Sequence, residues 1–335
     1  MSMSTIRMRD ILALIAVVAI IVAMIPTVVL TGLVGAADNG TITVDFQTGN
    51  SPPTVDNVTL YDNATTTITT MTPLVEYVIR VNVTEGLTFD NLTTVTAWLY
   101  RSDNSTFVWP NYTDTDNQTR AKFTWTKSTG LFSMVSNGTW ELVQADCHAP
   151  GLGSSTGSFD FHFKPGKVAQ ESTSDSHEWH VYAVADNGAN IGDNHQTGLE
   201  MAWYSEISVG SAVHFGSVNL GAADQQSPAF SNTYVANGTY ARAVSAATSW
   251  TNGSATLSLV GSTPGASQFA LKANETTGAP GATQVNGSYA NLSTGHGITG
   301  DAGDLISSNY LFLSLGSTGV PSGTYSGNVY YEIHS

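Results

Sequence analysis

The chain has 335 residues, with 11 basic and 26 acidic side chains, so its formal net charge at pH 7 is −15. This acidic balance disfavours nucleic acid and anionic lipid as partners, because both bind clusters of Lys and Arg. Only 11% of the residues are charged, so Ser, Thr and Asn must supply most of the polar surface. The length is sufficient for two hydrophobic cores.

The N-terminus has the three parts of a secretory signal peptide. Two arginines precede an apolar run that starts at Ile11, and small residues follow as far as Ala37. A positive start, an apolar centre and a small-residue end predict that residues 1–37 are a signal peptide, cleaved at its end. Because this apolar stretch is long enough to span a bilayer, a second interpretation stays open, in which residues 11–34 remain as a membrane anchor.

Residues 38–53 are predicted to form an N-terminal strand and a linker. Thr41–Gln47 alternates polar and apolar side chains, and the TGNSPP segment after it has the composition of an extended spacer. Two partners for this strand stay open: its own domain, or the exposed sheet edge of a neighbouring subunit. Head-to-tail donation of the strand would build a filament.

The rest of the chain has the pattern of an all-β protein. Apolar side chains recur at every second position, in short runs bounded by Gly, Asn, Asp and Pro. Many short strands with frequent turns are typical of antiparallel β-sandwiches. The predicted strands include Val75–Thr84, Val95–Tyr100, Ala121–Lys127, Ser158–Phe163, Glu178–Ala185, Met201–Val209, Ala212–Leu220, Tyr234–Ala246, Ala255–Val260, Tyr310–Leu315 and Gly323–Ile333.

The composition changes near Tyr204, from a region rich in Trp and Asp to one dominated by Ala, Gly and Ser. We therefore predict two β-sandwich domains, residues 54–206 and residues 207–335, after the N-terminal hydrophobic helix. Six of the seven tryptophans lie in the first domain. We expect them to pack in its core rather than to form a sugar-binding surface.

Fourteen of the 22 asparagines stand in Asn-x-Ser/Thr triplets, which are acceptors for N-glycosylation. Such triplets are useful only on an exported chain, so they predict an extracellular or cell-surface glycoprotein. Because no triplet follows Asn291, the C-terminal strands are predicted to be a sugar-free assembly surface. The predicted acceptors are Asn39, Asn57, Asn63, Asn82, Asn91, Asn104, Asn111, Asn117, Asn137, Asn237, Asn252, Asn274, Asn286 and Asn291.

Two short motifs resemble catalytic signatures but lack the necessary context. Gly153–Gly157 matches the nucleophile elbow of hydrolases, yet a predicted strand follows it where that motif requires a helix. His177 and His180 lack the spacing of a helical zinc site, and on a strand they face opposite sides. We therefore predict no enzyme activity. Cys147, the only cysteine, is expected to be a small buried residue rather than a nucleophile.

The segment Asp186–Asn194 gathers five oxygen-bearing side chains in a glycine-containing loop. Ca²⁺ prefers oxygen ligands on flexible loops. Two interpretations stay open: a calcium site with Asp186 and Asp193 among its ligands, or turns of the Asx type without a metal. No other cofactor is predicted.

Several segments resemble Ig-like modules of archaeal secreted surface proteins. The likeness covers most of residues 54–190, and the Pro321–Tyr330 segment is similar to the closing strand of many surface β-sandwiches. The resemblance implies Ig-like sandwiches in an S-layer, a cell-surface fibre or a sheath, and it brings no catalytic residues. The segments that carry it are Phe161–Ala169 (FHFKPGKVA), Trp179–Asp186 (WHVYAVAD), Val58–Asp62, Met71–Pro73, Val75–Val83 and Phe123–Lys127.

Together, these patterns predict a structural subunit of an extracellular filament or surface layer. It would assemble with copies of itself through β-strand contacts, carry N-linked glycans, and touch a membrane only through residues 11–34 if they are retained. Two alternatives stay open. One is a cell-surface adhesin or carbohydrate-binding module, and the other is a pilin-like subunit with a retained N-terminal helix.

Overall fold

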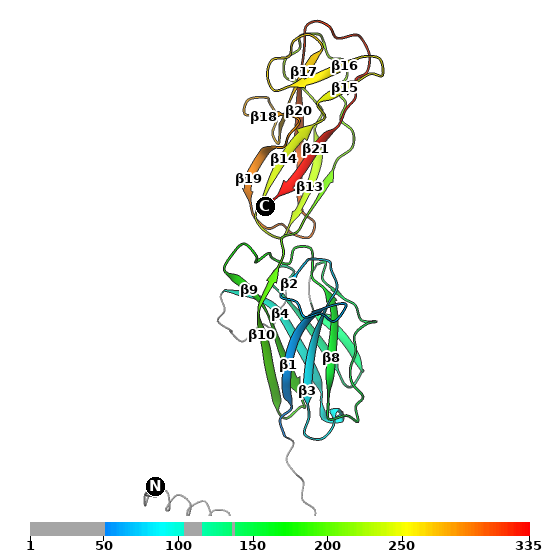
Figure 1. The fold of residues 1–335 in the computed structure, drawn as a ribbon, viewed down its shortest axis with the longest axis vertical. Helices are drawn as coiled ribbons and strands as arrows, with labels where there is room; N and C mark the ends of the chain where they lie inside the picture. The colour runs from blue at the N-terminus through cyan, green and yellow to red at the C-terminus, as the bar shows by residue number, and fades with distance from the viewer. Residues whose placement is uncertain (1–50, 104–115, 136–137) are drawn as a thin grey trace, which may run out of the picture. The chain divides into compact units, whose positions relative to one another are not determined.

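The computed structural model describes residues 51–103, 116–135 and 138–335. The predicted strand at residues 41–47 and the predicted signal or anchor lie outside the described residues. The described part is all-β, as predicted, with a single 3-10 turn, η1 (Phe89–Asn91), and no α-helix (Figure 1).

Strands up to Met201 form the first pair of sheets. The four-stranded sheet has the order β1-β3-β8-β7, and the six-stranded sheet has the order β2-β10-β9-β4-β5-β6. All pairings in these two sheets are antiparallel except the short contact of β2 with β10. The strands are β1 (Thr54–Asp62), β2 (Thr70–Met71), β3 (Tyr77–Thr84), β4 (Thr94–Asp103), β5 (Arg120–Thr126), β6 (Leu131–Val135), β7 (Glu141–Leu142), β8 (Thr156–Lys164), β9 (His177–Asp186) and β10 (Ile191–Met201).

Alternating aromatic side chains join these two sheets into a sandwich. Phe159, Phe161 and Phe163 on β8 are fully buried, because every second side chain of a strand points to the same face. They meet rings from β5 in the other sheet. The ring centroids are 4.9 Å apart for Trp125 and Phe159, and 5.0 Å apart for Phe123 and Phe163. The period-two pattern therefore builds the first core.

Strands from Ser205 onward form the second pair of sheets. One has the order β11-β13-β20-β17-β16-β15, with β12 beside β20 and β18 beside β17, and the other has the order β19-β14-β21. The pairing of β16 with β17 is parallel. The strands are β11 (Ser205–Val209), β12 (Gln225–Gln226), β13 (Phe230–Ala236), β14 (Tyr240–Ala246), β15 (Ser249–Thr251), β16 (Thr256–Val260), β17 (Gln268–Asn274), β18 (Thr283–Val285), β19 (Ala290–His296), β20 (Asp304–Leu315) and β21 (Val329–His334).

Val244 on β14 shares a core with Phe269 and Leu271 on β17, so these two sheets form a second sandwich. This sandwich contains a buried charge that the sequence pattern did not reveal. The side chain of Arg242, on β14, is only 4% exposed. Its guanidinium donates to the Tyr240 hydroxyl at 2.9 Å and pairs with Glu275 at 3.2 Å, and it lies 4.7 Å from the centroid of the Tyr234 ring. These partners compensate the cost of removing the charge from water.

The structure differs from the strand predictions at three places. Ala212–Leu220 is a loop, because Gly216 adopts a φ of +71° and breaks the extended pattern. Tyr234–Ala246 is two strands, β13 and β14, with a turn between them. The predicted strand Met201–Val209 is interrupted at residues 202–204, where the chain passes from the first pair of sheets to the second.

Candidate functional site

The junction between the two sandwiches is centred on Asn237, in the turn between β13 and β14. This side chain is fully buried. Its Nδ2 donates to the carbonyl oxygens of Ala169, at 2.8 Å, and Ala202, at 2.9 Å. Its Oδ1 accepts from the backbone N–H of Tyr204 at 2.7 Å. One amide thus connects the second sandwich both to the first sandwich and to the connecting segment.

The backbone of Asn237 also makes hydrogen bonds to the connecting segment and to the first sandwich. Its N–H donates to the Tyr204 carbonyl at 3.2 Å, and its carbonyl accepts from the Glu171 N–H at 2.9 Å. The Glu171 carboxylate is itself buried and accepts from the Thr173 hydroxyl and from the N–H and hydroxyl of Ser174, all at 2.6 Å. The loop that receives Asn237 is therefore held in place by its own hydrogen bonds.

Asp301 makes a second connection between the sandwiches. One carboxylate oxygen accepts from Asn117 Nδ2 at 2.6 Å and the other from the Thr139 hydroxyl at 2.7 Å. Gly138 adopts a φ of +77°, and a Cβ at this position would lie 1.9 Å from Asp301 Oδ2. Only glycine fits this approach, so the backbone here is shaped around the aspartate.

The predicted sugar acceptors differ widely in accessibility. Asn237 has no space for a glycan in the folded protein, because its side chain is buried and Nδ2, the atom that would carry the sugar, donates two hydrogen bonds. We therefore no longer expect it to be modified. The exposed acceptors are Asn57, Asn63, Asn286 and Asn291, the partly exposed ones are Asn82, Asn91, Asn117, Asn252 and Asn274, and Asn39, Asn104, Asn111 and Asn137 lie outside the described residues.

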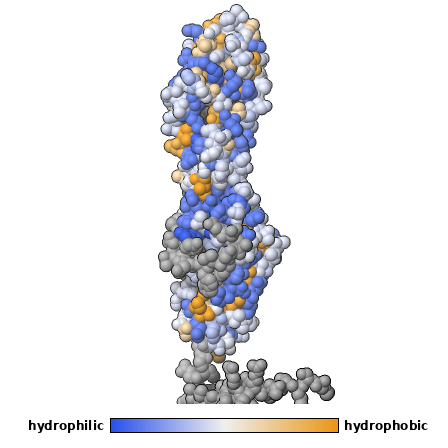
Figure 2. All heavy atoms as spheres, turned by 90° about the vertical axis from the view of Figure 1, so that its left-hand side faces the viewer, coloured by the Kyte–Doolittle hydropathy of each residue, from blue (hydrophilic) through white to orange (hydrophobic). Residues whose placement is uncertain are grey.

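Asn291 changes the expectation of a sugar-free C-terminal surface. Its Oδ1 lies 3.1 Å from Nε2 of His334, at the end of the last strand, β21. A glycan on Asn291 would therefore cover part of that strand. More generally, the face drawn in Figure 2 shows small apolar patches separated by polar surface.

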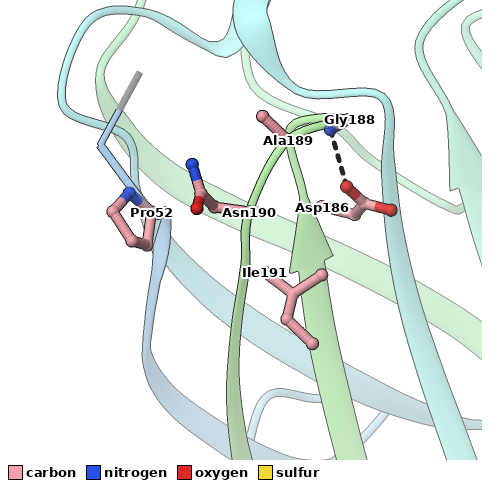
Figure 3. Close-up of a pocket in the computed structure, with 6 residues that line it drawn as sticks. All are labelled: Pro52, Asp186, Gly188, Ala189, Asn190 and Ile191. Carbon is pink, nitrogen blue, oxygen red and sulfur yellow. Dashed lines mark hydrogen bonds between the residues drawn. The ribbon is translucent and has the colours of Figure 1, made fainter. Parts of the chain in front are cut away.

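The hairpin between β9 and β10 contains the candidate calcium ligands (Figure 3). Asp186 Oδ1 accepts the Gly188 N–H at 2.6 Å, and Asn187 Oδ1 accepts the N–H groups of Ala189 and Asn190 at 3.2 and 2.9 Å. Asp193 is exposed on β10. Figure 3 shows Asp186 and Asn190 on opposite sides of the hairpin, around an open depression. These bonds are those of Asx-type turns, and the calcium site stays a prediction.

A different group of metal-type ligands lies on the first sandwich. Donor atoms of Glu76, Asp146 and His162 all lie within 4.8 Å of one another, and His162 Nδ1 is 2.9 Å from Glu76 Oε1. Nitrogen and carboxylate donors of this kind suit transition metals better than calcium. No sequence pattern indicated this group, because its members come from three separate segments that only the fold brings together.

Cys147 lies beside this group and is half-buried. Its sulfur accepts the backbone N–H of His162 at 3.3 Å. Burial raises the pKa of the thiol to about 11, so the group is protonated near neutral pH. A protonated thiol that serves as a hydrogen-bond acceptor is a poor nucleophile.

Most of the histidines and tryptophans that the sequence analysis named are packed against other side chains. His177 and His180 both lie on β9, with His180 fully buried against the Tyr100 ring at 5.4 Å. Trp125, Trp140 and Trp179 are buried in the first core, as expected. Trp98 and Trp203 differ from this expectation because both are partly exposed. The Trp98 ring centroid lies 5.7 Å from that of Tyr182, and Trp203 packs against the cluster that contains Tyr234 and Tyr240. Trp109 lies outside the described residues.

Within the described ranges, the structure has no helix that is long and apolar enough to cross a membrane. No protein-family profile matches the chain, and no curated protein is similar to it.

Proposed function

We propose that this chain is a structural subunit of an extracellular filament or surface layer. Its two β-sandwiches are of the Ig-like type found in the archaeal surface proteins that the sequence resembles. The subunit is exported, carries N-linked glycans and assembles with copies of itself. Its role is mechanical, and it has no catalytic function.

The junction carries this proposal. A subunit that bears load between neighbours must pass force from one domain to the next without a loose linker. Here only residues 202–204 separate β10 from β11, and the Asn237 and Asp301 side chains contribute five hydrogen bonds to the contact. The bond to the Ala169 carbonyl is buried and the other four are partly buried, and a buried donor or acceptor that loses its partner is costly. The pair of sandwiches therefore acts as one mechanical unit.

The accessible sugar acceptors support an extracellular location. Asn57 and Asn63 are exposed on the first sandwich, and Asn286 and Asn291 on the second. Glycans at these positions would shield both sandwiches from proteases and from unspecific association. This distribution fits a subunit whose surface faces the surrounding medium except where it meets neighbouring subunits.

Strand donation by Thr41–Gln47 is the proposed mode of assembly. Main-chain hydrogen bonds to a sheet edge give such contacts their strength, and side-chain pockets give them specificity. Deleting residues 38–50 should yield a folded monomer, because β1 begins only at Thr54 and both cores stay intact. We would compare this variant with the wild type by light scattering and circular dichroism. Polymers formed by the deleted chain would exclude donation by this segment.

The state of the N-terminus decides how the subunit is attached to the cell surface. A cleaved signal leaves a subunit held only by its neighbours, whereas a retained segment at residues 11–34 anchors it to the membrane or, in a pilin-like form, packs within the filament. Mass spectrometry of the mature N-terminus distinguishes them. A first residue at 37 or 38 supports cleavage of the signal, an intact first residue supports the anchor, and a first residue just before the apolar run supports the pilin-like form.

A further inference from the structure

We propose that β6 is the sheet edge that accepts the Thr41–Gln47 strand of a second copy of this chain. This inference rests on the proposed function and adds the acceptor surface to it. β6 is the last strand of the six-stranded sheet, and within the described ranges β5 is its only strand partner. Its outer backbone edge is therefore available for pairing.

The composition of β6 sets it apart from a protected edge. Its sequence, LFSMV, has no charge and no proline, which are the usual means of blocking edge-to-edge association. Leu131 is 55% exposed and Val135 is 57% exposed. Among the strands that the structure describes, β6 is the only one with two large hydrophobic side chains so exposed. In a monomer, such an edge would promote aggregation, and a strand added to it would prevent this.

Two other edges of the described sheets are occupied or charged. On β1, the Leu60 N–H donates to Gln196 Oε1 at 2.7 Å, and the Val55 carbonyl accepts from Asn194 Nδ2 at 3.0 Å. These two side chains of β10 close the β1 edge. β11 carries Glu206, which pairs with Lys167 at 3.3 Å. The contrast favours β6 over these two edges.

The donor strand matches the acceptor in length and polarity. Its seven residues are enough to cover the five residues of β6. On the inner side of β6, Phe132 is buried, and Met134 and the neighbouring Leu142 of β7 are only partly buried at the margin of the first core. The donor has an apolar face that would cover this margin, formed by Ile42, Val44 and Phe46, and an opposite polar face formed by Thr41, Thr43, Asp45 and Gln47.

The length of the chain requires that the donor come from another copy. Ser51 is fixed beside the β9–β10 hairpin, because its carbonyl accepts from Asn187 Nδ2 at 2.9 Å. A strand added outside β6 lies four strand spacings from β9, or about 19 Å. The four residue steps from Gln47 to Ser51 reach at most about 14 Å. A donor that pairs along its whole length, up to Gln47, therefore cannot reach β6 of its own chain, and donation in trans links one copy to the next.

Disulfide trapping tests the contact. We would place Ser133→Cys on β6 in the full chain with Cys147→Ser, which keeps an acceptor for the His162 N–H. Each donor position would then be replaced by cysteine in turn. Ser133 is exposed on the outer face of β6, so the polar-face positions should cross-link to it and the apolar-face positions should not. The expected result is loss of most of the monomer band, converted to a ladder of multimers that reductant removes.

The controls separate failure of the acceptor from failure of the function. Ser208→Cys, an exposed serine on the β11 edge, is the matched acceptor control and should give no ladder with any donor position. If Cys147→Ser and the wild type both stay monomeric, the proposed function fails and the acceptor fails with it. If they polymerise and Ser133→Cys traps no donor position, β6 is the wrong edge while the function stands. Cross-links within single chains would overturn donation in trans.

Discussion

Asn237 Nδ2 donates to the Ala169 carbonyl at 2.8 Å, across the boundary between the two sandwiches. The same nitrogen also donates to the Ala202 carbonyl. A residue in a sugar-acceptor triplet is therefore part of the junction. A sugar on this nitrogen and the closed junction exclude each other. The closed junction therefore requires that Asn237 remain unglycosylated.

Asn237→Ala should destabilise the protein. The substitution leaves two carbonyls and one N–H without their partner in a buried site, and each such group costs about 1–3 kcal/mol. Because water can enter the space that is left, we expect a total loss of roughly 3 kcal/mol in the free energy of unfolding. Urea denaturation of unglycosylated protein measures it, and the two sandwiches should then unfold in separate transitions.

Asn63→Ala is the matched control, because Asn63 is an exposed sugar-acceptor asparagine in a turn. Its effect should stay within about 0.5 kcal/mol, as for most surface substitutions. Equal effects of the two substitutions would show that the junction bonds contribute little to stability.

Glycan occupancy should follow the accessibility of the amide nitrogen. In native material, peptide mass spectrometry should find Asn237 unmodified, whereas the exposed Asn57, Asn63, Asn286 and Asn291 should carry sugar. A glycan on Asn237 in folded, native protein would contradict the junction as described.

His180 should make the protein sensitive to acid. Desolvation lowers the pKa of this buried imidazole below its usual 6.5, against an opposing contribution from Glu178. Below pH 6.5 the unfolded chain therefore binds a proton that the folded chain does not, and the free energy of unfolding falls as the pH decreases toward the folded pKa. One group changes it by at most about 1.4 kcal/mol per pH unit.

His180→Phe should remove this part of the pH dependence while it keeps a ring against Tyr100. Chemical denaturation at pH 7.5 and at pH 5.5 measures the effect. His214→Gln, at an exposed position, should behave like the wild type. His296, whose pKa is also lowered by burial, leaves a residual dependence of the same sign in every variant. An unchanged pH dependence in His180→Phe would show that this histidine does not contribute.

Cys147 should react slowly with thiol reagents. A pKa raised from 9.0 to about 11 leaves roughly a hundredfold less thiolate near neutral pH, and the thiolate is the reactive form. Labelling by a chromogenic disulfide at pH 8 should be slow in the native protein and fast in 6 M guanidinium chloride, which is the control. Equal rates in the two conditions would contradict the buried, hydrogen-bonded thiol.

The alternation of apolar side chains predicted much of the fold. β8, expected at Ser158–Phe163, extends from Thr156 to Lys164, and its three phenylalanines face the core as period two requires. The same rule failed at Ala212–Leu220, where the apolar residues Phe215 and Val218 pack against the second core from a loop. Burial of single side chains does not require an extended strand, so a pattern of this length cannot distinguish the two.

The candidate sites were less predictable, because they depend on contacts between distant segments. Asn237 in an Asn-Gly-Thr triplet looks like any sugar acceptor until the fold places the Ala169 carbonyl beside it, 68 residues earlier in the chain. Arg242 and Glu275 are likewise 33 residues apart, and no local spacing links them. β6 was not among the predicted strands, since the five residues of LFSMV carry only a short alternation.

Electron microscopy of the protein isolated from its native cell surface would show directly whether the subunits assemble. We expect a filament or lattice in which each repeating unit contains both sandwiches, and in which an extra strand lies beside β6 of the neighbouring subunit. A population of single, monomeric particles at the concentration found on the cell would contradict it.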